Sequence, residues 1–200
     1  MEGYLIGLEG VFPSPSAAVL FVFVQVGLLM TESRQRRRAL NVLARAEPMF
    51  PPLWLALAVG FAARLGFGFL KVGVFRGELR EALVWAGGGI ALLGWWLRLW
   101  AQHALGRYFI GAVAVQPQQP VVQSGPYRWV RHPAYTGGFL ASVGLGLMLS
   151  TWLGALVSAL MLIWAYAVRV PREEQLLVSQ LGEAYRAYMS RTRRFVPFVF

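Results

Sequence analysis

Long apolar runs constrain the fold of this chain more than any other feature of its sequence. The hydrocarbon core of a bilayer is about 30 Å thick, and an α-helix needs about 20 mostly apolar residues to cross it. Three runs come close to that length and lie at 14–30, 52–70 and 82–101. The pattern therefore predicts helices that span a membrane.

A fourth apolar stretch, 134–168, is too long for a single crossing. Small and polar residues interrupt it near the middle, at Gly144, Gly146, Ser150 and Thr151. We expect a tight helical hairpin here, with spans at 134–149 and 151–168. The sequence thus predicts an all-α, polytopic membrane protein with about five transmembrane helices, folded as one membrane-embedded domain over residues 1–200.

The basic residues are distributed unevenly along the chain. The net charge is +10, although only 14% of the residues are charged and 57% are hydrophobic. Fourteen of the 19 Lys and Arg residues lie in segments that five spans put on one side of the membrane, namely 31–51, 102–133 and 169–200. Because cytoplasmic loops carry the excess of Lys and Arg, we expect the N-terminus outside and the C-terminus in the cytoplasm.

The same distribution argues against nucleic acid as a partner. An isoelectric point near 11 would suggest nucleic-acid binding in a soluble protein. Here membrane topology and attraction to anionic lipid head groups account for the basic segments, including the run at 34–38. The expected partner of these residues is therefore the lipid bilayer.

Several residue types are absent or rare, and this excludes whole classes of chemistry. The chain has no Cys and no Asp, so disulfides, thiolate nucleophiles, Cys-ligated metals and Ser-His-Asp triads are excluded, although Glu can replace Asp in some triads. There are only two histidines, His103 and His132. No metal site is expected, and His103 is interpreted as an interfacial polar residue.

The first polar segment with a distinctive pattern is 116–138, on the predicted cytoplasmic side. Gly125 and Pro126 mark a turn, and His132 precedes Pro133, a residue favoured at the first position of a helix. A helix that begins at Pro133 would leave free backbone N–H groups for an anion, at Ala134, Tyr135 and Thr136. The alternative is an interfacial aromatic belt whose neighbouring arginines bind phospholipid, formed by Tyr127, Trp129 and Tyr135.

The second such segment is 169–188, which continues from the last span as a predicted cytoplasmic amphipathic helix. Arg169 and Glu173 head a stripe at i, i+4 spacing that continues through Leu177, Leu181, Tyr185 and Tyr188. We expect this stripe to be packed, and we expect Pro171 to kink the helix between Arg169 and Glu173. The alternative is a surface ion pair worth a few tenths of a kcal/mol.

Two arginines lie within apolar runs, where ionisable residues are usually functional. Arg98 is near the cytoplasmic end of its span and is expected to snorkel to the interface. Arg64 lies deeper, and the sequence offers no evident partner for it. The run of three glycines at 87–89 is expected to let helices approach closely.

The two polar segments together resemble the isoprenylcysteine carboxyl methyltransferase family, small membrane enzymes that use S-adenosylmethionine. The similar stretch extends from Leu105 to the C-terminus, about half of the chain. Its most specific parts, in order, are Val121-Val122-Gln123-Ser124-Gly125-Pro126-Tyr127, Arg131-His132-Pro133-Ala134-Tyr135-Thr136-Gly137, Arg169-Val170-Pro171-Arg172-Glu173-Glu174, Tyr185 with Tyr188, and Phe195-Val196-Pro197-Phe198.

The resemblance implies where the S-adenosylmethionine would bind. It would be lined by Gln116, Gln119, Pro120, Val121, Val122, Tyr127, His132, Pro133, Ala134 and Tyr135, and completed by Glu173. The resemblance also implies that Arg169 meets a substrate carboxylate, so that Arg169 and Glu173 are the expected catalytic residues. The implied substrate is an isoprenylcysteine-like or other amphiphilic molecule, or a prenylated protein.

Other functions stay open from the sequence. A methyltransferase on the same scaffold could act on a lipid amine or a small thiol. Related membrane reductases bind a nicotinamide cofactor instead, and a non-catalytic transport or scaffold protein is the alternative outside the enzymes. The polar motifs lie on the predicted cytoplasmic side rather than at the membrane midplane, which argues against a transporter.

Overall fold

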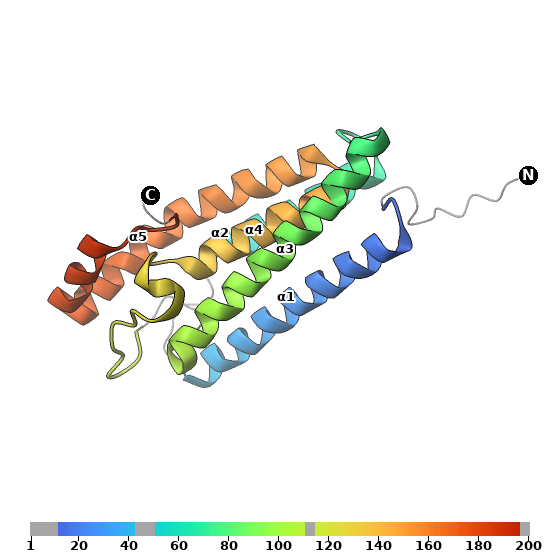
Figure 1. Cartoon of the computed structure of the whole chain (residues 1–200). Coiled ribbons are helices and arrows are strands. Elements are labelled where there is room, and N and C mark those ends of the chain that lie inside the picture. The colour runs from blue at the N-terminus through green and yellow to red at the C-terminus, as the bar shows by residue number, and fades with distance from the viewer. Residues whose placement is uncertain (1–11, 43–50, 111–114, 197–200) are drawn as a thin grey trace, which may run out of the picture.

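Five α-helices lie roughly side by side in the computed structural model, which describes residues 12–42, 51–110 and 115–196 (Figure 1). Their bounds are Pro15–Val42 for α1, Pro51–Phe69 for α2, Gly77–Leu105 for α3, Pro133–Met148 for α4 and Trp152–Arg191 for α5. Two short 3-10 helices follow α3, η2 at Gly106–Tyr108 and η3 at Gly125–Arg128. The described ranges contain no β-sheet, so the all-α prediction is confirmed.

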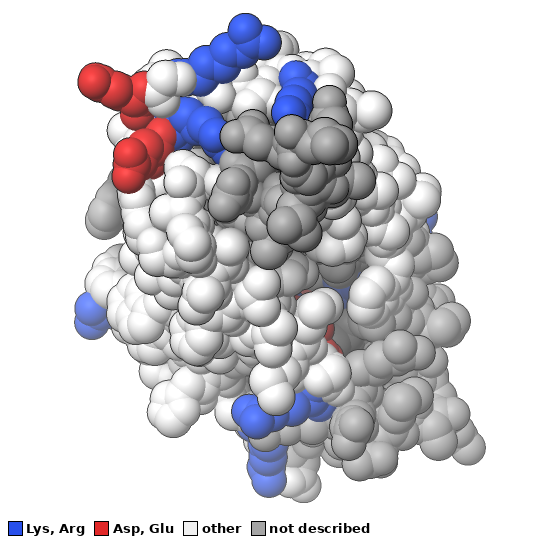
Figure 2. Space-filling model, turned by 90° about the vertical axis from the view of Figure 1, so that its right-hand side faces the viewer, with Lys and Arg blue, Asp and Glu red and all other residues white. Residues whose placement is uncertain are grey.

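Four of these helices, α1, α2, α3 and α5, are long and apolar enough to cross a membrane. The helix α4 is shorter, with 16 residues. In Figure 2 the charged side chains lie mainly at the upper and lower edges of the face shown, and the described surface between them is mostly uncharged. The prediction of a polytopic membrane protein is therefore confirmed.

The predicted hairpin lies where the sequence placed it. The helix α4 ends at Met148 and α5 begins at Trp152, so the connection is very short. Ser150 in this turn has a positive φ of 58°, and the Thr151 hydroxyl caps α5 by accepting a hydrogen bond from the Gly154 N–H at 3.2 Å. A Ser/Thr side chain at this position satisfies a backbone donor that the first helical turn leaves unpaired.

Glycines let the backbones of α3 and α4 touch directly. A Cβ atom added at Gly94 of α3 would lie 2.6 Å from the Gly137 carbonyl oxygen of α4, and one added at Gly87 would lie 2.7 Å from the Gly144 carbonyl oxygen. The expectation of close packing at 87–89 is confirmed for Gly87, whereas Gly89 faces open space. The contact at Gly94 is the more important of the two, because it brings Arg98, one turn later in α3, close to the start of α4.

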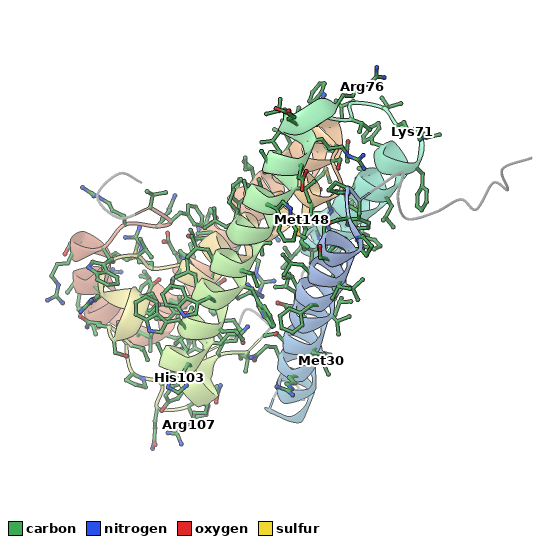
Figure 3. The ribbon with its side chains drawn as sticks, turned by 45° about the vertical axis from the view of Figure 1, so that its right-hand side comes forward. Met30, Lys71, Arg76, His103, Arg107 and Met148 are labelled. Atoms are coloured by element: carbon green, nitrogen blue, oxygen red, sulfur yellow. The ribbon has the colours of Figure 1, made fainter. Side chains whose placement is uncertain are left out.

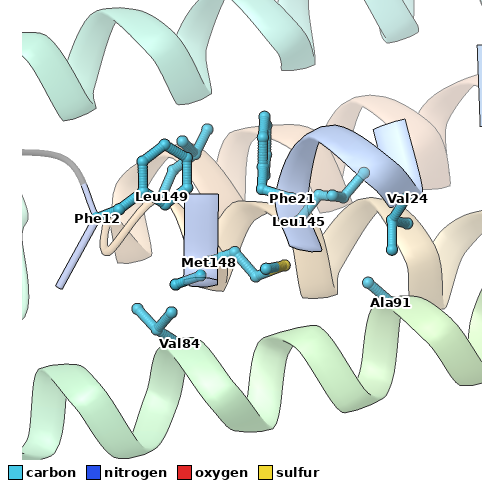
Figure 4. Close-up of a cluster of buried hydrophobic side chains, with 9 residues drawn as sticks. Phe12, Phe21, Val24, Val84, Ala91, Leu145, Met148 and Leu149 are labelled. Atoms are coloured by element: carbon cyan, nitrogen blue, oxygen red, sulfur yellow. The ribbon is translucent and has the colours of Figure 1, made fainter. Parts of the chain in front are cut away.

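The largest apolar cluster lies away from the polar segments. It brings together the N-terminal part of α1, two residues of α3 and the end of α4, namely Phe12, Ala17, Phe21, Val24, Val84, Ala91, Leu145, Met148 and Leu149 (Figure 4). A second cluster joins α2 to α5 through Ala56, Leu162, Ala165, Tyr166 and Val170. The helix α4 thus lies between α3 on one side and the α2–α5 pair on the other.

The helix α5 has its break at Gly182, a position that the sequence did not indicate. The helix α5 continues through Pro171, whose missing N–H cannot make the i→i−4 hydrogen bond of a helix. Gly182 has φ 59° and ψ −137°, a conformation that glycine adopts without steric cost. There the chain reverses, and Figure 1 shows the red end of α5 turning back toward the start of α4.

We predict that Gly94→Ala lowers the free energy of unfolding in detergent by about 1–3 kcal/mol, because the new methyl group meets rigid backbone. Gly89→Ala is the matched control on the same helix. With open space at Gly89, that change should be neutral or stabilise the protein by up to about 1 kcal/mol. Equal stabilities of the two variants would contradict the direct contact between α3 and α4.

Candidate functional site

The two polar segments meet at the end of the bundle where α4 begins. The Tyr188 hydroxyl near the end of α5 donates to the Tyr127 carbonyl of η3 at 2.7 Å. Figure 3 shows His103 and Arg107 at this end of α3, and Lys71 and Arg76 at the opposite end of the molecule. Segments that are distant in sequence therefore share one polar end.

Three side chains from α4 and α5 form the centre of this end. The Tyr135 hydroxyl donates to Glu173 Oε2 at 2.6 Å, and the Arg169 Nε–H donates to the oxygen of the same hydroxyl. Arg169 Nε lies 3.8 Å from Glu173 Oε2. The Arg169 side chain is buried, whereas about a quarter of the Glu173 side chain is exposed, 27%. Glu173 therefore remains accessible, and Arg169 is held in place by its neighbours.

The neighbouring acid, Glu174, is the residue that the sequence pattern missed. Its Oε1 accepts from Arg131 Nε at 2.9 Å and lies 3.2 Å from His132 Nε2. Its Oε2 accepts from Arg194 Nε at 3.1 Å and Arg194 Nη2 at 2.8 Å. The side chain is only 5% exposed. A buried carboxylate needs such partners, but none of them is near Glu174 in sequence.

The predicted packed stripe of α5 is consequently only partly right. The structure buries Arg169, Tyr185 and Tyr188 as expected. The other residues of the stripe, Glu173, Leu177 and Leu181, are only half-buried, whereas Val170 and Glu174 are buried. The stripe assumed one uninterrupted helix. The break at Gly182 rotates the last turns relative to the first part of α5, so residues on its two sides do not continue one face.

The helix α4 begins at Pro133 as predicted, but two of the three N–H groups expected to be free, those of Tyr135 and Thr136, are not. The Tyr135 and Thr136 N–H groups both donate to the His132 carbonyl, at 3.0 and 3.2 Å. His132 is the N-cap, and the N-cap carbonyl accepts the first hydrogen bonds of a helix. The His132 side chain does not cap the helix and is directed at Glu174.

Arg98 does not snorkel into water, which corrects the sequence prediction. Its Nε donates to Glu32 Oε1 of α1 at 2.7 Å, and its Nη1 donates to the Ala134 carbonyl at 2.8 Å. The Gly94–Gly137 contact one turn earlier brings Arg98 to the first turn of α4. Arg98 thereby ties α1 and α3 to the residue that precedes Tyr135.

Arg64 also has a partner that its sequence position did not reveal. The side chain is buried, and its Nη1 donates to the carbonyl and the hydroxyl of Ser142 at 3.0 and 3.2 Å. This joins α2 to α4 within the bundle. Arg64 belongs to helix packing, away from the polar end.

In the loop part of the expected cofactor site, the two glutamines contact each other and the residues that follow α3. The Gln116 N–H donates to Gln119 Oε1 at 3.0 Å, and the Gln116 side-chain amide donates to the Arg107 carbonyl at 2.8 Å. Pro120 is exposed and Val121 is half-buried.

Apolar contacts link that loop to the start of α4. Val122 packs against a small cluster of Ala101, Tyr127 and Ala134. Burial raises the pKa of the Tyr127 hydroxyl well above its ordinary value, so this side chain stays neutral. In the described ranges, no group of three or more His, Cys, Asp or Glu side chains is arranged to hold a metal ion.

We predict that Arg98→Ala lowers the free energy of unfolding by about 1–3 kcal/mol, because two charge-assisted contacts are lost. Glu32→Ala should cost less, since the Glu32 side chain is 35% exposed. In a double-mutant cycle the pair should show a coupling of about 0.5–2 kcal/mol. Glu183→Ala, which breaks the exposed Arg186 pair, should change stability by less than about 0.5 kcal/mol. Additive effects of the Arg98 and Glu32 variants would contradict the pairing.

Comparison with known proteins relates this geometry to a family. The model of the isoprenylcysteine carboxyl methyltransferase family matches residues 88–179. The protein-S-isoprenylcysteine O-methyltransferase of Schizosaccharomyces pombe is 31% identical over 113 residues, 56% of this chain and 48% of the relative. The corresponding protein of Rattus norvegicus is 32% identical over 136 residues, 66% and 48% of the two chains. The chain spans about half the length of these curated relatives.

A solved structure agrees at the level of the fold. The structure of the eukaryotic intramembrane Ras methyltransferase superposes with a TM-score of 0.67 and 20% sequence identity, and the match covers 96% of this chain and 71% of the other. The family match includes the Gly94–Gly137 contact between α3 and α4, the start of α4, and Glu173 and Glu174 of α5. Through residues 88–179, the chain is similar to the isoprenylcysteine carboxyl methyltransferase family.

Proposed function

We propose that this protein is a membrane-embedded, S-adenosylmethionine-dependent methyltransferase that methylates the carboxylate of an isoprenylcysteine-like or other amphiphilic substrate. The observation that carries the proposal is the contact of Arg169 and Glu173 with one Tyr135 hydroxyl at the start of α4. A cationic and an anionic group are thereby held side by side. Such a pair suits a reaction between an anionic acceptor and a cationic methyl donor.

The side chains present fit S-adenosylmethionine. Bound there, this cofactor would supply an electrophilic methyl group on a sulfonium sulfur. Glu173 is partly exposed and contacts Tyr135 through Oε2 only, so its carboxylate can face the amino group or the sulfonium. Glu174 cannot take this role, because both of its oxygens already accept hydrogen bonds. We infer that the cofactor is held by Glu173 together with Gln116, Gln119, Pro120, Val121, Val122, Tyr127, His132, Pro133, Ala134 and Tyr135.

The acceptor chemistry requires positioning more than proton transfer. A carboxylate is already ionised at pH 7, so a strong general base is unnecessary. Arg169 would orient that carboxylate through its planar guanidinium. Tyr135 would keep the Arg169 side chain in the required orientation. Holding the acceptor oxygen, the methyl carbon and the sulfur in line then accounts for most of the rate enhancement.

The depth of the site favours an amphiphilic acceptor. We infer that α4 is a fifth membrane helix, with the N-terminus outside and the polar end with the 169–188 segment on the cytoplasmic side. At 1.5 Å per residue, the 16 residues of α4 extend about 24 Å, which is less than the thickness of the hydrocarbon core. The start of α4 would therefore lie at or below the membrane surface. A substrate with an apolar tail can reach this depth from the bilayer.

Methyl transfer from labelled S-adenosylmethionine to a panel of acceptors tests the proposal. The panel contains prenylcysteine analogues, extracted phospholipids with amine head groups, and small thiols. We expect transfer to the prenylcysteine carboxylates. Transfer only to amines or thiols would overturn the carboxylate assignment. Thermal stabilisation by NADPH but not by S-adenosylhomocysteine would indicate a reductase, and stabilisation by neither would indicate a non-catalytic protein.

We predict that Glu173→Gln lowers methyl transfer by roughly 100-fold or more, because the carboxylate that faces the cationic cofactor is lost. The folded state should persist, since Glu173 is partly exposed. Glu183→Gln is the control on the same helix, and its side chain is 83% exposed. It should keep full activity. Full activity of Glu173→Gln would refute the role of that carboxylate.

We predict that Arg169→Ala lowers kcat/KM for a carboxylate acceptor by roughly 100-fold, through loss of the guanidinium that orients it. Arg169→Lys should recover only part of this loss, because an ammonium group lacks the planar pair of donors. Any residual transfer to an amine acceptor should change much less. An equal loss on carboxylate and amine acceptors would remove the proposed contact with the carboxylate.

A further inference from the structure

The chain after α5 returns to the start of α4 and pairs with it. The Arg131 N–H donates to the Arg193 carbonyl at 2.7 Å, and the His132 N–H donates to the Arg194 carbonyl at 3.0 Å. In the opposite sense, the Arg193 N–H donates to the Trp129 carbonyl at 3.2 Å. Residues 129–132 and 193–194 thus lie side by side as a short parallel pair. The reversal at Gly182 makes this return possible.

Side chains strengthen this pairing at three points. The Thr136 hydroxyl of α4 donates to the Phe195 carbonyl at 2.9 Å. Arg131 donates to the Met189 carbonyl at 3.0 Å and also to the Thr192 carbonyl. Arg194 donates two hydrogen bonds to Glu174 Oε2. The C-terminal segment is therefore attached to α4, to the preceding loop and to α5.

Glu174 connects the C-terminal segment to the His132 side chain, because it contacts both Arg194 and His132. Its Oε1 faces the His132 ring, and its Oε2 is held by the Arg194 guanidinium. A carboxylate held at both oxygens cannot rotate about its terminal torsion. Because the carboxylate accepts only, the stable contact with His132 has a proton on Nε2. The His132 ring is buried and packs edge-on against Tyr135 at a centroid distance of 5.5 Å.

We propose that Glu174 and Arg194 are positioning residues of the cofactor site, which hold the His132 imidazole and the first turn of α4 in the geometry that binds the cofactor. The inference rests on the proposed function, since it concerns the same site. Neither residue needs to touch the cofactor. The C-terminal segment then forms an integral wall of the site, and its sequence influences cofactor affinity.

A spectroscopic experiment tests, without any ligand, whether Glu174 and Arg194 hold the His132 imidazole. Only two histidines are present, and His103 is exposed, so ¹⁵N-histidine labelling of a His103→Gln variant leaves one reporter, His132. We expect an Nε2-bound proton in slow exchange with solvent, because the group is buried and hydrogen-bonded. This proton resonance should be lost or broadened in Arg194→Ala and in Glu174→Gln.

Arg193→Ala is the matched control. Arg193 is the adjacent arginine, its side chain is exposed, and only its backbone takes part in the pairing. The control removes the same charge from the same segment. It should leave the His132 resonance unchanged. The same loss in Arg193→Ala, or an intact resonance in Arg194→Ala, would overturn the proposal.

The effect of these residues on cofactor affinity is measured by binding and kinetics in folded variants, with thermal unfolding as the check on folding. We expect Arg194→Ala to raise the Kd for S-adenosylhomocysteine and the KM for S-adenosylmethionine roughly tenfold. The kcat at saturating cofactor should change little, and Arg194→Lys should recover part of the affinity. A fall in kcat with unchanged KM would overturn the positioning role. If the wild type binds no S-adenosylhomocysteine, the proposed function fails, while the His132 resonance still tests the contact through Glu174.

Discussion

Charged side chains inside this bundle must find their partners within the protein, and the rest of the structure depends on that constraint. Lipid offers no hydrogen bonds and stabilises no isolated charge. Arg98 therefore bonds to Glu32 and to the Ala134 carbonyl, and Arg64 bonds to Ser142. Each contact joins two helices, so the requirement to pair charges also determines how the helices are held together.

The close approach of α3 and α4 makes the most important of these contacts possible. Glycines remove the side chains that would separate the two backbones, and Arg98 follows Gly94 by one turn. Its guanidinium can then reach the Ala134 carbonyl at the start of α4. In this way the packing of small residues within the membrane determines where Tyr135 lies, and Tyr135 in turn contacts Arg169 and Glu173.

Two adjacent glutamates lie in different surroundings, and the proposed function therefore gives them different tasks. Glu173 contacts one hydroxyl through Oε2 and keeps an exposed edge, which suits the proposed contact with a cationic cofactor. Glu174 is buried among Arg131, His132 and Arg194, and both of its oxygens are occupied. We therefore assign the first to binding and the second to holding the site together. The two residues have the same chemistry, and only their neighbours distinguish them.

The sequence by itself determined the apolar helices, the hairpin at 149–151, the start of α4 at Pro133 and the two polar segments that meet there. These follow from local properties, namely run length, turn residues and the conformational limits of proline. Only the tertiary structure decided that the chain reverses at Gly182, that Arg98 pairs with Glu32 and that Glu174 is the buried acid. The physical reason is that burial and charge pairing join residues distant in sequence, and those contacts exist only after the helices have packed.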